Sequence, residues 1–368
     1  MDNLINRQRG IGDTNKMKIL FFINTPAQAL TWIPIIRELK SKGHEIRILA
    51  RDYGSAPEIL KSNGLDYISY KPISHKYLRI FELLVHLQKG YDQSRKYGIN
   101  MVIGWGVDAA LTAAIIGKSS IIFTDNDRTH LQDKMTNLFA GAVITPDCSL
   151  ANFGKKQIRI GGYKELVYLN PNNFVPDPSI YGELKINREE KFIILRFNVW
   201  DAVHDIGLHG LSSSDKFKLV TELSKYAHVF ISPEGALNKE LEGYRLPISY
   251  SRIHHALYYA QLLVTDTQTM ATEAAILGTA AIRCNNVTGI GVFQELEKKY
   301  DLIYSYNDFK QTLDKAIELL KLPDLKEQWA KKRQILLNDK IDVKQFMVNF
   351  IDNYPESLIE YQRKRGLF

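Results

Sequence analysis

The segment from residue 261 to residue 285, QLLVTDTQTMATEAAILGTAAIRCN, constrains the fold of this chain more than any other. Its apolar run Leu262–Thr265 predicts a strand, which the polar turn Asp266–Thr269 follows. The small, mostly apolar residues after the turn predict a helix, and Ala280–Arg283 predicts a second strand. A strand, a helix and a strand joined this closely form a right-handed crossover between parallel strands of one sheet. The segment therefore predicts an α/β protein in which this helix begins at the carboxyl edge of a parallel sheet, where ligands of such folds bind.

The start of this helix has the chemistry of a phosphate-binding site. A helix N-terminus offers free backbone N–H groups and a partial positive charge, and Thr267 and Thr269 add hydroxyl donors. Glu273 lies four residues after Thr269, so the two side chains share a helix face, and the carboxylate could reach a ribose diol behind the phosphates. The alternative is an ordinary strand–helix turn in which Asp266 or Thr267 caps the helix.

Predicted strands and helices alternate along both halves of the chain, as in doubly wound parallel sheets. A turn-rich stretch with clustered Pro and Asn, YLNPNNFVPDPSIYG, separates the halves. We therefore expect two Rossmann-like domains. The expected boundaries are 1–16 for a flexible N-terminal arm, 17–167 for the N-terminal domain, 168–185 for a linker, 186–340 for the C-terminal domain, and 341–368 for a helix that packs back across the first domain.

Composition indicates a globular protein and limits its partners. The chain is 45% hydrophobic and 24% charged, and no apolar run approaches the length of a membrane span. Its polar start lacks a signal-peptide core, and its two cysteines, Cys148 and Cys284, are far apart, which favours a reducing cytoplasm. The net charge of +7 is spread among nearly as many acids, so nucleic acid is not an expected partner. An anionic sugar nucleotide, or an anionic membrane surface that holds a lipid acceptor, suits this balance.

Five segments together resemble a known family: FFINTPAQALTWIPIIRELKSKGHEIRILAR, IIFTDNDRTHLQDKMTNLFAGAVITP, GGYKELVYLNP, ILRFNVWDAVHD and RIHHALYYAQLLVTDTQTMATEAAILGTAAIRCN. The chain is similar to archaeal and bacterial proteins of unassigned function that are placed in the GT-B glycosyltransferase superfamily. It also resembles the related non-hydrolysing UDP-N-acetylglucosamine 2-epimerases. The resemblance covers nearly the whole chain. It implies two Rossmann-like domains facing a central cleft, with the acceptor on the first domain and the nucleotide-sugar donor on the second.

The resemblance also implies roles for residues of the second half. In the related families an Asp-Ser-Gly-Gly turn precedes a helix whose acidic residue holds the ribose, and the spacing from Asp266 to Glu273 matches the epimerases. Gln268 and Thr269 stand where those families have glycines, so their contact with the phosphates would differ. Epimerases have an arginine comparable to Arg196, which could grip a diphosphate with two hydrogen bonds. The other residues expected in the donor pocket are Ser232, Glu234, His254 and His255.

The best catalytic candidates follow the predicted strand 120–124. Asp125, Asp127 and His130 could include a base for an acceptor hydroxyl or a sugar C–H group. The epimerases have a His-x-Glu motif at the matching place, which makes Asp127 the closest counterpart and Asp125 the other option; Asp127 as a helix cap is the alternative. Asp-x-Asp also resembles the metal motif of a different glycosyltransferase class. GT-B enzymes stabilise the leaving diphosphate with helix dipoles and cations, so neither a metal nor a cofactor is expected.

The turn after the first strand is expected to face the acceptor, through Asn24, Thr25 and Gln28. Members of the family tend to have His-Pro-Ala-His-Val-His here, and Thr25 and Gln28 replace two of those histidines. Histidine can act as a base near neutral pH, whereas Thr and Gln cannot. Either the base lies elsewhere, or the acceptor differs, or activity is lost. The alternative is a plain strand–helix turn in which Pro26 opens the helix. Trp105, between two glycines, is expected to form a wall of the cleft.

These observations favour a metal-independent hexosyltransferase. It would move a sugar from a nucleotide-diphosphate donor, expected to be UDP-linked, to a glycan or a lipid-linked acceptor. The alternatives are a sugar-nucleotide 2-epimerase, or a non-catalytic sugar-nucleotide-binding protein on the same frame. We expect a cytoplasmic monomer or homodimer that can contact the inner face of the membrane. The predicted helix 76–97 has an apolar stripe with Lys, Arg and aromatic residues, which is typical of a membrane-surface helix and also of a helix that covers a sheet.

Overall fold

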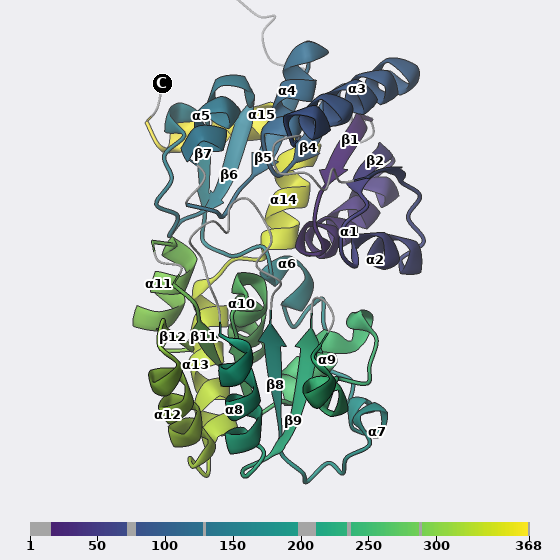
Figure 1. Cartoon of the computed structure of the whole chain (residues 1–368). Helices are drawn as coiled ribbons and strands as arrows, with labels where there is room; N and C mark the ends of the chain where they lie inside the picture. The colour runs from purple at the N-terminus through teal and green to yellow at the C-terminus, as the bar shows by residue number, and fades with distance from the viewer. Residues whose placement is uncertain are drawn as a thin grey trace, which may run out of the picture.

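A computed structural model describes residues 16–71, 79–127, 130–197, 211–233, 237–286 and 289–366. Figure 1 shows two α/β lobes stacked end to end, each built around its own sheet. The expected N-terminal arm, residues 1–16, lies outside the described residues apart from Lys16. The expectation of two doubly wound parallel sheets is confirmed, because every strand pair in both sheets is parallel.

The N-terminal lobe has a seven-stranded sheet in the order β3-β2-β1-β4-β5-β6-β7. Its interior strand β1 is almost entirely buried, because helices cover both faces, and this explains why the strand is a continuous apolar run after Lys18. The strands are β1 (Lys18–Ile23), β2 (Glu45–Arg51), β3 (Ile68–Tyr70), β4 (Met101–Gly104), β5 (Ser119–Phe123), β6 (Ala142–Pro146) and β7 (Gln157–Ile160). The helices are α1 (Pro26–Ser41), α2 (Ala56–Ser62), α3 (Arg79–Tyr97), α4 (Val107–Ile115) and α5 (His130–Phe139).

The C-terminal lobe has a five-stranded sheet in the order β12-β11-β10-β8-β9. The crossover predicted from residues 261–285 forms β10, α10 and β11, and Gly278 ends α10 in a left-handed conformation with φ of 74°. The strands are β8 (Phe192–Phe197), β9 (His228–Pro233), β10 (Leu262–Thr265), β11 (Ala280–Cys284) and β12 (Ile303–Tyr306). The helices are α7 (Ile180–Leu184), α8 (Ser213–Leu223), α9 (Ile253–Tyr259), α10 (Gln268–Leu277), α11 (Gly291–Lys298), α12 (Phe309–Leu320) and α13 (Leu325–Asp339).

Three further helices lie outside the two sets given above, and one of them, α6, packs against both lobes. α6 (Leu166–Leu169) packs against α1 and α14 (Val343–Asp352) of the upper lobe and against α10 of the lower lobe. The helical stretch expected from residue 343 to about residue 361 is two helices, α14 and α15 (Glu356–Lys364), with Pro355 between them. Proline lacks the N–H that a continuing helix needs, which accounts for the break. The expected linker, 168–185, is also partly helical, since it contains the end of α6 and all of α7.

The two lobes touch closely along one side. A Cβ atom on Gly291, at the start of α11, would lie 1.8 Å from the carbonyl oxygen of Cys148 in the loop after β6. Beside this contact, Tyr163 Oη donates to Glu295 Oε2 at 2.5 Å, and Lys340 Nζ lies 2.8 Å from the same oxygen. Only glycine fits at position 291, so this side of the junction is fixed by backbone packing as well as by charge.

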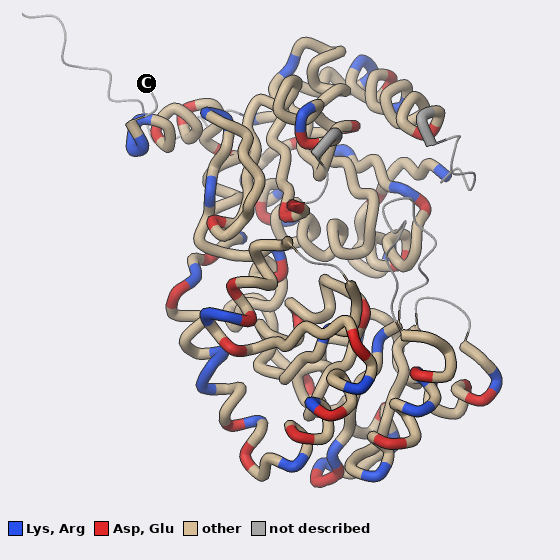
Figure 2. Tube along the Cα trace, turned by 60° about the vertical axis from the view of Figure 1, so that its left-hand side comes forward, with Lys and Arg blue, Asp and Glu red and all other residues tan. Residues whose placement is uncertain are grey.

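Helix α3 covers the sheet and also presents an apolar outer face. Glu82 and His86 are buried on its inner side, whereas Phe81, Leu84 and Val85 are 52%, 55% and 41% exposed. The buried inner side agrees with the interpretation of the predicted helix 76–97 as a helix that covers the sheet, whereas the membrane-surface interpretation stays a prediction. The helix begins at Arg79 among the described residues. No helix in the described part of the chain is long and apolar enough to span a membrane. Figure 2 shows Lys and Arg intermixed with Asp and Glu over both lobes.

Candidate functional site

The carboxyl edge of the C-terminal sheet gathers two arginines on one face. Arg196 on β8, Thr265 on β10 and Arg283 on β11 are register partners, and partners in register on parallel strands point to the same face of the sheet. The Arg196 Nη1 atom donates to the Oγ and the backbone oxygen of Ser232 at 3.1 and 3.2 Å. Arg196 and Ser232, both expected in the donor pocket, therefore lie together.

Arg283 adds a second positive charge to this edge. Its guanidinium lies 4.3 Å from the ring centre of Phe293 and donates to Ser305 Oγ. Burial lowers the pKa of Arg283 to about 10, while the charge of Glu297 opposes that shift. Arg283 therefore stays positively charged at neutral pH, and both it and Arg196 are more than nine-tenths buried.

Helix α10 begins between these strands. Its N-cap residue, Thr267, makes no side-chain cap to the helix, because its Oγ1 lies 2.8 Å from Thr265 Oγ1. Thr267 and Thr269 are half-buried and Gln268 is exposed, so solvent reaches the first turn of α10. The turn thus retains N–H groups, hydroxyls and neighbouring arginines, which is the chemistry an anion needs.

Glu273 lies one turn deeper in α10 and is 1% exposed. Its Oε1 accepts a hydrogen bond from Tyr168 Oη at 2.8 Å and lies 2.9 Å from His254 Nε2. Burial alone would raise the pKa of Glu273, but His254, Tyr168 and the charge of Lys164 hold it below its usual value. The carboxylate is therefore ionised and engaged by protein groups. Glu273 and His254, both predicted for the donor site, are in contact.

The second histidine of the pair lies elsewhere. His255 Nδ1 accepts the backbone N–H of Asp177 at 3.0 Å, and its ring centre lies 4.9 Å from that of Phe174. Burial, with the nearby charge of Arg252, lowers the pKa of His255. His255 thus holds the segment between α6 and α7 and has no contact with Glu273 among those described. The side chain of His130 and the whole of Glu234 lie outside the described residues.

Asp125 belongs to a charged group at the junction of the lobes. Lys164 Nζ forms ion pairs with Asp125 Oδ2 and with Glu165 Oε1, the latter at 2.7 Å. Burial would lower the pKa of Lys164, but the two carboxylates hold it above its usual value. Glu165 is 1% exposed, and burial together with the charge of Asp125 raises its pKa to about 7, although Lys164 opposes this. No sequence motif indicated that Lys164, Glu165 and Tyr168 would belong to the site. The only signal was that all three lie in the segment GGYKELVYLNP, one of the five that resemble the family.

Asp127 binds the two lobes together. Its Oδ1 accepts hydrogen bonds from Ser149 Oγ at 2.6 Å and from the backbone N–H groups of Leu150 and Ala151 at 2.9 and 3.2 Å. Its Oδ2 accepts the N–H of Gly291 at 2.8 Å. All four donors come from the junction, and Asp127 is only 8% exposed, so its carboxylate is held and covered by protein groups. This geometry favours a bridging role.

The residues expected on the acceptor side form a closed turn. Gln28 Oε1 accepts the N–H of Asn24 at 2.7 Å, and Thr25 Oγ1 caps α1 by accepting the N–H of Gln28 at 3.3 Å. Pro26 is the first residue of α1, as the plain-turn alternative requires. The ring of Trp105 packs against those of Trp32 and Phe123, with ring centres 5.5 and 4.5 Å away.

Behind this turn lies a buried polar cluster that the sequence did not indicate. Asn24 Nδ2 donates to Asp108 Oδ2 at 2.8 Å, and His86 Nδ1 lies 3.5 Å from the same oxygen. Burial alone would raise the pKa of Asp108, but His86, Asn24 and the N–H of Ala109 hold it below its usual value. Glu82, paired with Arg51 at 2.6 Å, continues the cluster. Glu82 and His86 are four residues apart on α3, which is the only sequence signal that could have linked them.

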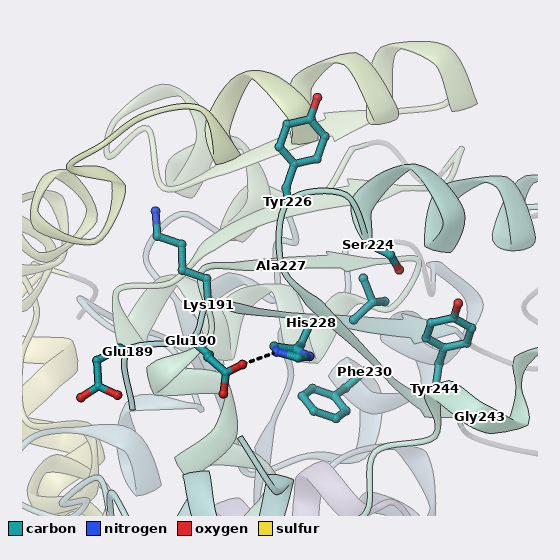
Figure 3. Close-up of a pocket in the computed structure, with 11 residues that line it drawn as sticks. Glu189, Glu190, Lys191, Ser224, Tyr226, Ala227, His228, Phe230, Gly243 and Tyr244 are labelled. Atoms are coloured by element: carbon teal, nitrogen blue, oxygen red, sulfur yellow. Dashed lines mark hydrogen bonds and ion pairs between the residues drawn. The ribbon is translucent and has the colours of Figure 1, made fainter. Parts of the chain in front are cut away.

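Two further features lie outside this region. A surface cavity of about 690 Å³ lies at the amino edge of the C-terminal sheet, the end opposite to the start of α10 (Figure 3). Glu190 and His228, 3.0 Å apart, line it. Within the described ranges, one group of three side chains is close enough together to bind a metal ion: Asp147, Cys148 and Glu295. The ammonium group of Lys340, 2.8 Å from Glu295 and 3.7 Å from Asp147, already supplies a positive charge there.

Comparisons with known proteins agree with this fold. A family model described as "Protein of unknown function (DUF354)" matches residues 22–356, and no curated protein matches the chain. The S. aureus MnaA–UDP co-structure is similar with a TM-score of 0.70 at 11% identity, over 93% of this chain and 97% of that chain. UDP-GlcNAc 2-epimerase from Neisseria meningitidis, bound to UDP-GlcNAc, gives 0.64 at 12% identity, over 94% and 100%. Spinosyn forosaminyltransferase SpnP gives 0.62 at 11% identity, over 94% and 100%. At such identities the likeness is one of fold, and it confirms the GT-B architecture.

Proposed function

We propose that this chain, which belongs to the family described as protein of unknown function (DUF354), is a metal-independent GT-B glycosyltransferase. It moves a hexose from a nucleotide-diphosphate-sugar donor, UDP-linked, to a glycan or lipid-linked acceptor. One observation carries the proposal: the solvent-accessible start of α10 lies beside Arg196 and Arg283, on one edge of the sheet. The S. aureus and Neisseria structures, which hold UDP and UDP-GlcNAc, support a donor of this class.

The donor's diphosphate is assigned to this edge. Arg196 and the N–H groups of α10 would bind the phosphate oxygens, with Thr267 and Thr269 contributing hydroxyls. When the sugar leaves, the diphosphate gains negative charge, and fixed positive groups stabilise that charge best where water is excluded. Arginine and a helix terminus can fill this role without a metal ion. Glu273 would bind the ribose diol.

The acceptor is assigned to the N-terminal lobe, with Asp125 as the base. Asp125 is the expected catalytic carboxylate that is not held by four donors, and it forms an ion pair with Lys164. Asn24, Thr25, Gln28 and Trp105 would line the acceptor side. We assign the protein to the cytoplasm, with the apolar outer face of α3 as its contact with the inner membrane surface.

A sugar-nucleotide 2-epimerase is the second candidate, and one observation favours it. Such a reaction removes a proton from a sugar carbon and returns one, so it needs a group that exchanges protons near neutral pH. Glu165, whose pKa burial raises to about 7, has that property and lies beside Asp125 and Lys164.

A turnover assay separates these functions. UDP-GlcNAc and other UDP-, GDP-, dTDP- and CMP-sugars are incubated with the protein, with and without lipid-linked and glycan acceptors. A transferase releases the nucleotide (UDP, GDP, dTDP or CMP, according to the donor) only when an acceptor is present, whereas an epimerase converts the sugar nucleotide alone. The Asp125→Asn variant should lose transfer and retain donor binding. If donors bind with no turnover under any condition, the protein is a sugar-nucleotide-binding protein and the transferase proposal is wrong.

A further inference from the structure

Glu273, the residue assigned to the ribose, is covered in this structure. Its side chain is 1% exposed, although Gln268 and Thr269 at the start of the same helix are accessible to solvent. The two polar contacts of its carboxylate both end on Oε1, where Tyr168 Oη and His254 Nε2 lie 2.8 and 2.9 Å away. A ribose diol therefore reaches this carboxylate only if one of the covering side chains moves.

Tyr168 is the covering residue that can move, because it belongs to the junction of the lobes. His254 lies on α9, in the same lobe as Glu273, and the two stay together if the lobes shift. Tyr168 lies on α6, which packs against α1 and α14 of the other lobe as well as against α10 (Figure 1). A change in the arrangement of the lobes thus moves Tyr168 relative to Glu273.

Tyr168 also has neighbours at both ends of the assigned nucleotide site. The charges of Glu273 and Glu165 and the phenol of Tyr250 act on its hydroxyl, and the Tyr250 ring centre is 6.0 Å from the Arg196 guanidinium. Burial and these neighbours raise the pKa of Tyr168 well above its usual value. The phenol therefore stays protonated and donates a hydrogen bond to Glu273. A ribose hydroxyl is likewise a neutral O–H donor. The phenol thus makes the hydrogen bond that a ribose would make.

We propose that Tyr168 occupies the ribose position of the donor site and that a bound nucleotide displaces it. The inference rests on the proposed function, because it takes Glu273 as the ribose-binding residue. One O–H···carboxylate bond is exchanged for another, and no covalent bond changes. Lys164 lies four residues before Tyr168 in the same segment and pairs with Asp125. A nucleotide that displaces Tyr168 would therefore also move the partner of Asp125, the assigned acceptor base.

The exchange predicts that removing the phenol hydroxyl strengthens nucleotide binding. The bond from Tyr168 to Glu273 stabilises only the empty protein, so its loss raises the free energy of the empty state and leaves the complex unchanged. A hydrogen bond to a charged group has an effect on the order of tenfold in an equilibrium constant. We expect Tyr168→Phe to lower the Kd of UDP about tenfold, which corresponds to about 1.4 kcal/mol. If Tyr168 only supported the structure of the site, Tyr168→Phe would instead raise the Kd of UDP.

The experiment is calorimetric titration of UDP into the full chain, as wild type, Tyr168→Phe and Tyr163→Phe. Tyr163 is a matched control, because it lies in the same segment and its hydroxyl also donates to a carboxylate, Glu295, at 2.5 Å. Glu295 belongs to α11 and has no assigned contact with the nucleotide. The control should lose a comparable hydrogen bond and keep the wild-type Kd. A thermal unfolding scan of each protein verifies that it is folded.

The outcomes separate the inference from the proposed function. If Tyr168→Phe binds UDP more tightly than wild type and Tyr163→Phe does not, the result supports both the exchange and the donor site. The same holds if wild type binds UDP too weakly to measure and Tyr168→Phe binds it measurably. If wild type binds UDP and Tyr168→Phe binds it equally or more weakly, the exchange is refuted and the donor site stands. If no folded protein of the three binds UDP, the donor site itself is wrong and the inference falls with it.

Discussion

Asp127→Asn is expected to destabilise the protein without abolishing nucleotide binding. The asparagine carbonyl can replace Oδ1, which accepts from Ser149, Leu150 and Ala151. Its amide N–H₂ group must then face the N–H of Gly291, which now hydrogen-bonds to Oδ2 at 2.8 Å. One charge-assisted hydrogen bond is lost, a buried donor is left unsatisfied, and the remaining three bonds no longer reach an ionised group. These changes cost on the order of 3 kcal/mol.

For lobes of this size, a loss of about 3 kcal/mol lowers the unfolding temperature by roughly 6–12 °C. Differential scanning calorimetry of wild type and Asp127→Asn measures the shift, and Ser149→Ala, which removes one of the four donors, should give about a third of it. UDP affinity, titrated well below both unfolding temperatures, should stay within about threefold of wild type. An unfolding temperature within 2 °C of wild type, combined with complete loss of turnover, would refute the bridging role and restore Asp127 as the base.

Three further changes have expected outcomes. Because the pKa of Glu165 is raised to about 7 from an unfolded value of 4.5, the folded protein binds the extra proton between those pH values and loses stability as pH rises through them. In chemical denaturation from pH 5 to pH 8, Glu165→Gln should remove a decline on the order of 3 kcal/mol; an unchanged slope contradicts this origin. Gly291→Ala should part the lobes at Cys148 and lower the unfolding temperature by several degrees, whereas the open position Gly243 should tolerate alanine. Leu84→Glu should reduce flotation with anionic vesicles and leave UDP affinity unchanged; equal flotation excludes α3 as the membrane contact.

Local sequence patterns predicted the fold because both sheets are parallel and buried on both faces. Strand β1 after Lys18 and strand β8 before Arg196 are continuous apolar runs, and the helices between the strands are long enough to show their period. The strands β7 and β12 were not predicted. Each has four residues and includes polar ones, Gln157 and Arg159 in β7 and Ser305 in β12, so neither has a strong apolar signal.

The same limit applies to the site. Arg196 could be placed near Ser232, and one of the adjacent histidines His254 and His255 near Glu273, because the carboxyl ends of parallel strands and the helices after them meet at one edge. The sequence did not indicate which of the two histidines this would be. The partners that cross between lobes could not be predicted. Tyr168 lies 105 residues before Glu273 in the sequence, and its place depends on how α6 packs between two separately folded sheets.

The partners of Asp127 show this limit most clearly. The residue lies in the expected turn after β5, and its sequence motif suggested catalysis. Its donors come from the loop after β6 and from Gly291, 164 residues away. No local pattern indicates that a carboxylate will be held by so many N–H groups. The geometry therefore changes the role proposed for Asp127, while Asp125 in the same turn keeps its role.

Calorimetric titration of UDP into wild type, Arg196→Ala and Arg245→Ala tests the donor site most directly. Arg245 is a matched control, because it is an arginine of the same lobe that pairs with Glu242 on the surface. We predict that wild type and Arg245→Ala bind UDP equally and that Arg196→Ala binds about 10–100-fold more weakly, as expected for the loss of a charge-assisted contact to a phosphate. Equal binding by all three proteins, or no binding by wild type and Tyr168→Phe alike, would contradict a nucleotide site at the start of α10.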